Sequence, residues 1–216
     1  MSAGIETPPR MEAWREAFLR DGYMVVAFDA KTGEVSWQGV DEAANTSSPL
    51  VMASEGQPIP DIVFMTSLRV VGLNPLDGTV SWEFPLPFQP SDTAPTPILF
   101  GDTLFTSTMD NATTAIRLKR GDGAKPKKFW QGKGLSGYFS TGVASRERLF
   151  LVTKSLKPIP QAALVCVDRA TGKEEWKKSG IGYFHFGMVR TANDRLLVLD
   201  DSGKLKLLDA SAGQYR

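Results

Sequence analysis

The chain consists of short apolar runs separated by turns that are rich in Gly, Asp, Asn and Pro. One set of runs closes on an acidic or amide residue: YMVVAFD, RVVGLN, ALVCVD and KLKLLD end at residues 29, 74, 168 and 209. A second run lies upstream, as in IVFMT, LFTSTM, LFLVT and LLVLD, and a shorter third run lies earlier still. Runs of this length, rich in Val, Ile, Leu and Phe, predict short antiparallel strands.

The closing residue of each set opens a recurring phrase that supplies a fourth strand. Residues 29–37 read DAKTGEVSW, residues 74–82 read NPLDGTVSW, and residues 168–176 read DRATGKEEW. Two weaker copies are RLKRGDGAKPKKFW at residues 117–130 and DASAG at residues 209–213. The tryptophans of the series, at positions 37, 82, 130 and 176, lie 45, 48 and 46 residues apart.

Four strands at a period of about 45 residues predict an all-β fold, a β-propeller of four-stranded antiparallel blades. We expect three whole blades, preceded by the end of one blade and followed by the first three strands of another. Because propellers usually close with about four to eight blades, this count predicts a partial propeller. Such a chain would be an incomplete sequence, a gene fragment, or a piece completed by another subunit.

The recurring phrase has a structural interpretation. Its Gly supplies the positive φ of a tight turn between the third and fourth strands, and the Asp or Asn accepts a hydrogen bond from the turn backbone. Its Trp offers a large apolar face and one donor for docking against the next blade. The residues assigned to this structural repeat are Asp29, Gly33, Trp37, Asn74, Gly78, Trp82, Trp130, Asp168, Gly172, Trp176, Asp209 and Gly213.

These residues resemble the PQQ-like, or quinoprotein-type, β-propeller repeat family, whose blades carry an A-x-D-x-x-x-G-x-x-x-W tryptophan-docking motif. AFDAKTGEVSW at residues 27–37 fits the motif in full, CVDRATGKEEW at 166–176 nearly so, and GLNPLDGTVSW at 72–82 has Asn for Asp. The resemblance extends from about residue 15 to residue 216. The family includes quinone-dependent alcohol and sugar dehydrogenases, a lipoprotein of the outer-membrane assembly machine, and secreted propellers. Because the family is usually exported in bacteria, the resemblance implies a periplasmic or extracellular location.

The start of the chain allows two interpretations. PRMEAWREAFLRDGY, at residues 9–23, has the apolar spacing of a short amphipathic helix that carries Met11, Trp14 and Phe18 on one face. Alignment with the repeat instead favours strands across residues 17–28, with a turn at Asp21 and Gly22. We expect disorder over residues 1–10 and a single propeller segment over residues 11–216.

Composition narrows the class of protein. Apolar residues make up 42% of the chain and the formal net charge is +1, values of an ordinary globular protein. No stretch is apolar and long enough to cross a bilayer, and the N-terminus lacks the apolar region of a signal peptide. The balanced charge argues against nucleic acid as a partner, and the one basic cluster, at Lys125, Lys127 and Lys128, is expected in a solvated loop.

Few residues suggest chemistry. Cys166 is the single cysteine, lies between two valines and is expected to fill the core, so no intrachain disulfide can form. The adjacent-cysteine disulfide of the quinoprotein alcohol dehydrogenases is therefore absent. His185 is the single histidine, and no metal-ligating cluster accompanies it. No cofactor and no catalytic residue is predicted; pyrroloquinoline quinone with calcium belongs only to the enzyme alternative below.

Propeller geometry indicates where a ligand would sit. The first strand of every blade lines the central channel, so the loops that enter these strands meet at one mouth. The entering loops are residues 45–47, 92–94, 138–140 and 183–185. Asn45, Asp92, Tyr138 and His185 are the candidate ligand residues of this rim, and the alternative is that they only satisfy their own loops.

Two functions of different class remain open. The first, which we favour, is a non-catalytic scaffold that binds a protein or carbohydrate partner through its loops or strand edges, or is joined by the remaining blades. The alternative is a fragment of a quinone-dependent dehydrogenase with a bound Ca²⁺ and a carboxylate base. That enzyme needs a calcium-ligating acid and amide and an Arg at one mouth, and this chain offers Asn45 and Asp92 but no Arg at the channel entry.

Overall fold

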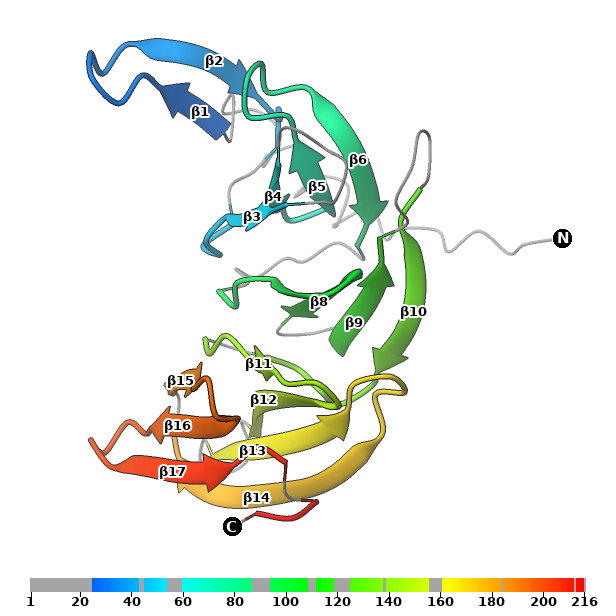
Figure 1. The fold of residues 1–216 in the computed structure, drawn as a ribbon, viewed down its shortest axis with the longest axis vertical. Coiled ribbons are helices and arrows are strands. Elements are labelled where there is room, and N and C mark those ends of the chain that lie inside the picture. The colour runs from blue at the N-terminus through cyan, green and yellow to red at the C-terminus, as the bar shows by residue number, and fades with distance from the viewer. Residues whose placement is uncertain are drawn as a thin grey trace, which may run out of the picture.

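The structure is a computed structural model that describes residues 25–42, 45–53, 60–86, 94–108, 112–118, 125–137, 139–155, 161–183, 185–211 and 213–215. Within these residues every element is a β-strand, and the strands form five antiparallel sheets that follow one another along the chain. Figure 1 shows the sheets fanned into an open arc, with β1–β2 at one end and β15–β17 at the other. The predicted all-β partial propeller is confirmed.

The first half of the arc holds an incomplete sheet and a complete one. The incomplete sheet pairs β1 (Val25–Phe28) with β2 (Val35–Gly39). The second sheet has the order β3–β4–β5–β6, formed by Leu50–Met52, Asp61–Met65, Arg69–Leu73 and Val80–Pro85. Figure 1 shows β3 toward the inside of the arc and β6 along its outside.

The second half repeats this arrangement. The third sheet is β7–β8–β9–β10, formed by Ile98–Phe100, Thr103–Thr108, Ala112–Arg117 and Lys127–Gly132. The fourth is β11–β12–β13–β14, formed by Val143–Ala144, Arg148–Ser155, Gln161–Asp168 and Glu174–Gly182. The last sheet has three strands, β15 (Gly187–Arg190), β16 (Arg195–Leu199) and β17 (Leu205–Asp209).

The core is divided into four apolar clusters, one between each pair of neighbouring sheets. Each cluster contains the tryptophan of the preceding blade and the apolar residue that stands one position before the turn of the following blade. The four pairs are Trp37 with Leu73, Trp82 with Ile116, Trp130 with Val167, and Trp176 with Leu208. Burial of these faces against one another drives the sheets to stack, since a sheet with one apolar face must cover it.

Each tryptophan stands opposite a small residue of the neighbouring third strand. The pairs are Trp37 with Ala27, Trp82 with Gly72, Trp130 with Ala115, and Trp176 with Cys166. In all four a register shift lies directly beside the pair, because the residue before the tryptophan is left without a partner in the ladder. A Cβ on Gly72 would come within 2.2 Å of the Trp82 indole nitrogen. The small partner therefore lets the ring lie flat across the strand.

The indole N–H groups find two kinds of acceptor. Trp37 donates to the Pro75 carbonyl at 2.8 Å and Trp130 to the Arg169 carbonyl at 2.9 Å, both in the turn of the next blade. Trp82 instead donates to the Asp61 carboxylate of its own blade at 3.0 Å. The motif alone would lead one to expect that every indole N–H bonds to the next blade. It cannot reveal the acceptor of Trp82, because Asp61 lies outside the recurring phrase.

Other expectations from the sequence have mixed outcomes. Residues 1–10 and most of the segment expected to be strand at residues 17–28 lie outside the described residues, which begin at Val25 within β1.

Cys166 is fully buried in β13. Burial raises the pKa of its thiol to about 12, with the neighbouring Glu175 carboxylate adding to the effect, so the thiol is protonated and unreactive at neutral pH.

Candidate functional site: the channel mouth

The channel mouth is formed by the loops that enter β3, β7, β11 and β15 on the inside of the arc. Of the four predicted rim residues, Asn45 and His185 are described, whereas Asp92 and Tyr138 lie outside the described residues. Asn45 precedes β3 and His185 precedes β15, with the third and fourth sheets between them. The structure therefore does not bring these two predicted residues into one cluster.

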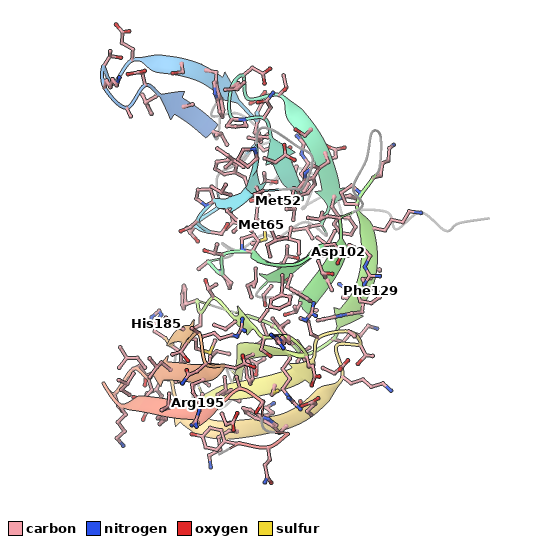
Figure 2. The ribbon with its side chains drawn as sticks, viewed as in Figure 1. Met52, Met65, Asp102, Phe129, His185 and Arg195 are labelled. Atoms are coloured by element: carbon pink, nitrogen blue, oxygen red, sulfur yellow. The ribbon has the colours of Figure 1, made fainter. Side chains whose placement is uncertain are left out.

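His185 does meet an aromatic ring from the neighbouring blade. Its imidazole lies against the Phe139 ring, with centroids 4.8 Å apart and planes tilted by 36°. Beneath this pair, the buried Ser140 hydroxyl accepts a hydrogen bond from the Phe186 amide at 2.9 Å. The two entering loops are thus fixed to each other by a ring contact and a buried hydrogen bond. Figure 2 shows His185 projecting on the inner side of the arc.

A second contact fixes the loop that carries His185. The Asp201 carboxylate, in the turn between β16 and β17, accepts the Tyr183 amide at 2.5 Å. The preceding Gly182 has a φ of 154°, and a Cβ there would come within 2.5 Å of the Asp201 carboxylate. Only glycine lets the chain pass this close to the carboxylate, so Tyr183 is held at the end of β14.

Hydroxyl groups also link the segments that lead into β3, β7 and β11. The Ser48 amide donates to the Thr96 hydroxyl at 3.3 Å, and the Thr96 amide donates to the Thr141 hydroxyl at 3.0 Å. These positions are 48 and 45 residues apart, which is the blade period. This row was not among the predicted site residues, although a hydroxyl residue stands at the same place in three successive blades of the sequence.

The two entering loops expose aromatic side chains. Phe139 is 44% exposed and Tyr183 is 58% exposed, and His185 is also exposed. Both aromatic residues stand in the entering loops that the sequence identified, but neither was selected as a candidate. Exposed rings held in fixed positions bind partners with little loss of side-chain entropy, since their conformations are already restricted.

The oxygen atoms of the described part of the mouth are considered next as possible ligands of the calcium that accompanies a quinone. Ca²⁺ takes roughly six to eight oxygen ligands, usually including carboxylates. The Asn45 side-chain oxygen accepts the Thr46 amide at 2.7 Å, and the Asp201 carboxylate is engaged with Tyr183. Among the described residues, no three His, Cys, Asp or Glu side chains gather as a metal-binding group.

None of the described segments forms a helix that is long and apolar enough to cross a bilayer.

Comparison with solved structures finds propellers of different function. BamB from Moraxella catarrhalis matches with a TM-score of 0.56 and 16% identity, over 90% of this chain and 57% of that chain. Quinohemoprotein alcohol dehydrogenase from Comamonas testosteroni matches with a TM-score of 0.56 and 11% identity, over 90% and 40%. The β-propeller domain of Cps50 (Swd1) from Myceliophteria thermophila matches with a TM-score of 0.55 and 13% identity, over 88% and 66%. At these identities the likeness shows the fold alone.

The chain spans 57% of the length of the Moraxella protein. No curated protein sequence matches it. A family model does: the model described as "Outer membrane protein assembly factor BamB" matches residues 1–178 of the 216. Together with the repeated Trp-bearing blades, this match shows that the chain belongs to the PQQ-like β-propeller family described by that model.

Proposed function

We propose that the chain is a non-catalytic propeller scaffold that binds a protein partner at the channel mouth. The observation that carries the proposal is the exposure of Phe139, Tyr183 and His185 in two neighbouring entering loops, which a ring contact between Phe139 and His185 and a buried hydrogen bond join. Aromatic side chains are enriched at protein interfaces, where one large ring fills a pocket of the partner.

The family supports a protein rather than a carbohydrate partner. The matching family model is described as an outer-membrane protein assembly factor, and assembly requires binding to other proteins. The same description supports a location in the cell envelope, outside the cytoplasm. The sheets supply a rigid frame for this task, because three of them are complete and each is packed against its neighbours.

Site-specific photocrosslinking tests the proposal. A photoreactive amino acid at position 183 should yield one discrete adduct with an envelope protein in living cells. The matched control carries the same amino acid at position 76, because Leu76 is 68% exposed but lies in the outer turn between β5 and β6.

The adduct at position 183 should weaken when Phe139→Ala is added, since this change removes an exposed ring from the neighbouring entering loop. Equal adducts at positions 183 and 76, or no adduct at 183, would contradict a binding mouth. A discrete adduct at position 76 alone would place the interface on the outer rim instead.

A further inference from the structure

Charge is segregated along the chain. Residues 1–93 contain five basic and thirteen acidic side chains, a formal net charge of −8, whereas residues 94–216 contain twenty basic and eleven acidic side chains, a net charge of +9. The division falls between the second and third sheets. A charge asymmetry of this size between two halves of a chain indicates that one half meets a partner of opposite charge.

Lysines gather on the outside of the third and fourth blades. Of the three lysines expected in a solvated loop, Lys127 and Lys128 stand instead in strand β10. Figure 1 shows β10 and β14 along the outside of the arc. The exposed lysines of these two strands and their flanking segments form what we call the lysine surface: Lys125, Lys127, Lys128, Lys133, Lys173, Lys177 and Lys178.

The two strands belong to one surface because the blades interlock between them. Trp130 of β10 donates its indole N–H to the Arg169 carbonyl at 2.9 Å, in the turn that precedes β14, and its ring lies on Gly172 of the same turn. Lys173 follows directly. Any further blade would stack on the first or the last sheet, so it would leave these outer strands uncovered.

The charge of the lysine surface is not neutralised within the blades. In the part of the chain that the structure describes, no ion pair joins any of these lysines to an acidic side chain. Arginines of the same half are instead fixed by internal contacts: Arg148 to Glu175 at 2.6 Å, Arg169 to the Arg146 carbonyl at 2.6 Å, and Arg117 over the Phe129 ring at 3.9 Å. The lysines are therefore available to a partner.

Protection of strand edges does not by itself explain the lysines. Lysine on an edge strand discourages pairing with another sheet. Strands β2 and β6 are edge strands of the same kind, yet neither contains a lysine, and β6 carries Glu83. The lysines follow the segregation of charge between the two halves rather than the positions of the edges.

We propose that the lysine surface binds the surface of an anionic lipid bilayer. Basic side chains near such a surface are each attracted to it, and flexible lysines need no fixed arrangement of acceptors. Phe129 lies beside the lysines of β10, is 41% exposed and supplies an apolar group for the interface. A protein partner matches less well, because lysine is depleted and arginine enriched at protein interfaces. The lysine surface does not depend on the channel mouth described above.

Co-sedimentation with lipid vesicles tests the proposal. The full chain is mixed with vesicles of phosphatidylcholine alone or of equal parts phosphatidylcholine and phosphatidylglycerol, and the bound fraction is measured at rising salt concentrations. The chain should bind only the vesicles that contain phosphatidylglycerol. Binding should fall steeply as the salt concentration rises, because salt screens the attraction between exposed charges.

Two double variants with the same change of net charge locate the binding. Lys127→Gln with Lys128→Gln removes two charges from the lysine surface and should weaken binding at least about tenfold. The matched control, Lys31→Gln with Lys204→Gln, removes two exposed lysines from the β1–β2 and β16–β17 turns and should bind within about twofold of the wild type. Both variants should keep the thermal unfolding midpoint of the wild type, since all four side chains are exposed.

Other results would overturn the proposal. Equal binding to both kinds of vesicle, no binding to either, or equal losses in the two double variants would show that the lysines do not form a membrane-binding surface. If the wild type bound soluble poly-glutamate and did not bind the vesicles, the partner would be an acidic protein instead.

Discussion

The second and fourth blades carry the same phrase but stabilise it with opposite charges. In the second blade, Asp61 opens the second strand and accepts hydrogen bonds from the Trp82 indole and the Ser81 hydroxyl. In the fourth blade, Arg148 opens the equivalent strand. Its guanidinium forms an ion pair with Glu175 at 2.6 Å and donates to the Ser211 carbonyl of the next turn at 2.8 Å.

The comparison separates what the repeat fixes from what it leaves variable. In both blades the tryptophan occupies the apolar cluster between neighbouring sheets. The polar contacts beside the ring are set by the first residue of the second strand and by the residue before the tryptophan. Ring packing is therefore common to the blades, whereas the hydrogen bonds that support it are particular to each.

The largest expected effect is removal of a shared ring. Trp82→Ala should lower the free energy of unfolding by about 3 kcal/mol, because removal of a large side chain from between two sheets leaves a cavity. Denaturant unfolding measures the loss. Leu76→Ala, at an exposed turn position, is the control and should change stability by less than about 0.5 kcal/mol. A loss below about 1 kcal/mol for Trp82→Ala would mean that the ring is not packed between the sheets.

The next effect isolates the contact between a ring and a turn glycine. Gly172→Ala places a methyl group against the Trp130 ring and forces a residue with a Cβ into positive φ, at a combined cost of about 2 to 4 kcal/mol. Gly101→Ala carries the backbone strain alone, since its Cβ would meet open space, and should cost about 1 kcal/mol. Thermal unfolding compares the two variants. Equal losses would show that the tryptophan does not lie on Gly172.

A smaller effect distinguishes the two kinds of indole acceptor. Asp61→Ala leaves the Trp82 N–H and the Ser81 hydroxyl without their acceptor, at a cost of about 1 to 3 kcal/mol. In a double-mutant cycle, Asp61→Ala and Trp82→Phe should couple by about 1 kcal/mol. Asp61→Ala and Trp130→Phe should be additive, because Trp130 donates to Arg169. Coupling in the second pair, or none in the first, would contradict the assigned acceptors.

The smallest effect concerns the turn carboxylates. Hydrogen bonds from Thr32 and Lys31 lower the pKa of Asp29, and hydrogen bonds from Ser211 lower the pKa of Asp209. A carboxyl whose pKa is lower in the folded state stabilises the fold above its unfolded pKa, near the ordinary 3.8, and this contribution is lost as the pH falls through the folded value.

NMR titration of the carboxyl groups measures these pKa values directly, and the pKa values of Asp29 and Asp209 should both lie below 3.8. Asp209→Asn should also reduce the loss of stability that occurs as the pH falls below the ordinary carboxyl pKa of 3.8. Titration of either carboxyl at or above its ordinary pKa would contradict the turn geometry.

The sequence predicted the parts of the molecule that repeat. The closing runs contain the third strands β1, β5, β13 and β17, and the tryptophan period places the fourth strands. This succeeds because packing between blades imposes one physical requirement on every copy. Polar contacts such as those of Asp61 and Arg148 could not be predicted, since they join residues of different strands whose register is visible only in the fold.

The location of the candidate site follows from the expected topology, whereas its side-chain contacts do not. The expected topology brings the entering loops to one mouth, and His185 lies on the loop before β15. Its contact with Phe139 depends on how two neighbouring blades pack, and no motif encodes that contact. The functional roles of Asn45, Asp92, Tyr138 and His185 stay predictions.

A titration with pyrroloquinoline quinone tests most directly whether this propeller is a non-catalytic binding scaffold. The full purified chain is mixed with quinone, with and without Ca²⁺, and binding is followed by absorption and by equilibrium dialysis. If the propeller is a non-catalytic scaffold, the spectrum should show no saturable change and the chain should retain no quinone. A saturable, calcium-dependent spectral change that Asp92→Ala abolishes would contradict the scaffold proposal and would support a fragment of a quinone-dependent dehydrogenase.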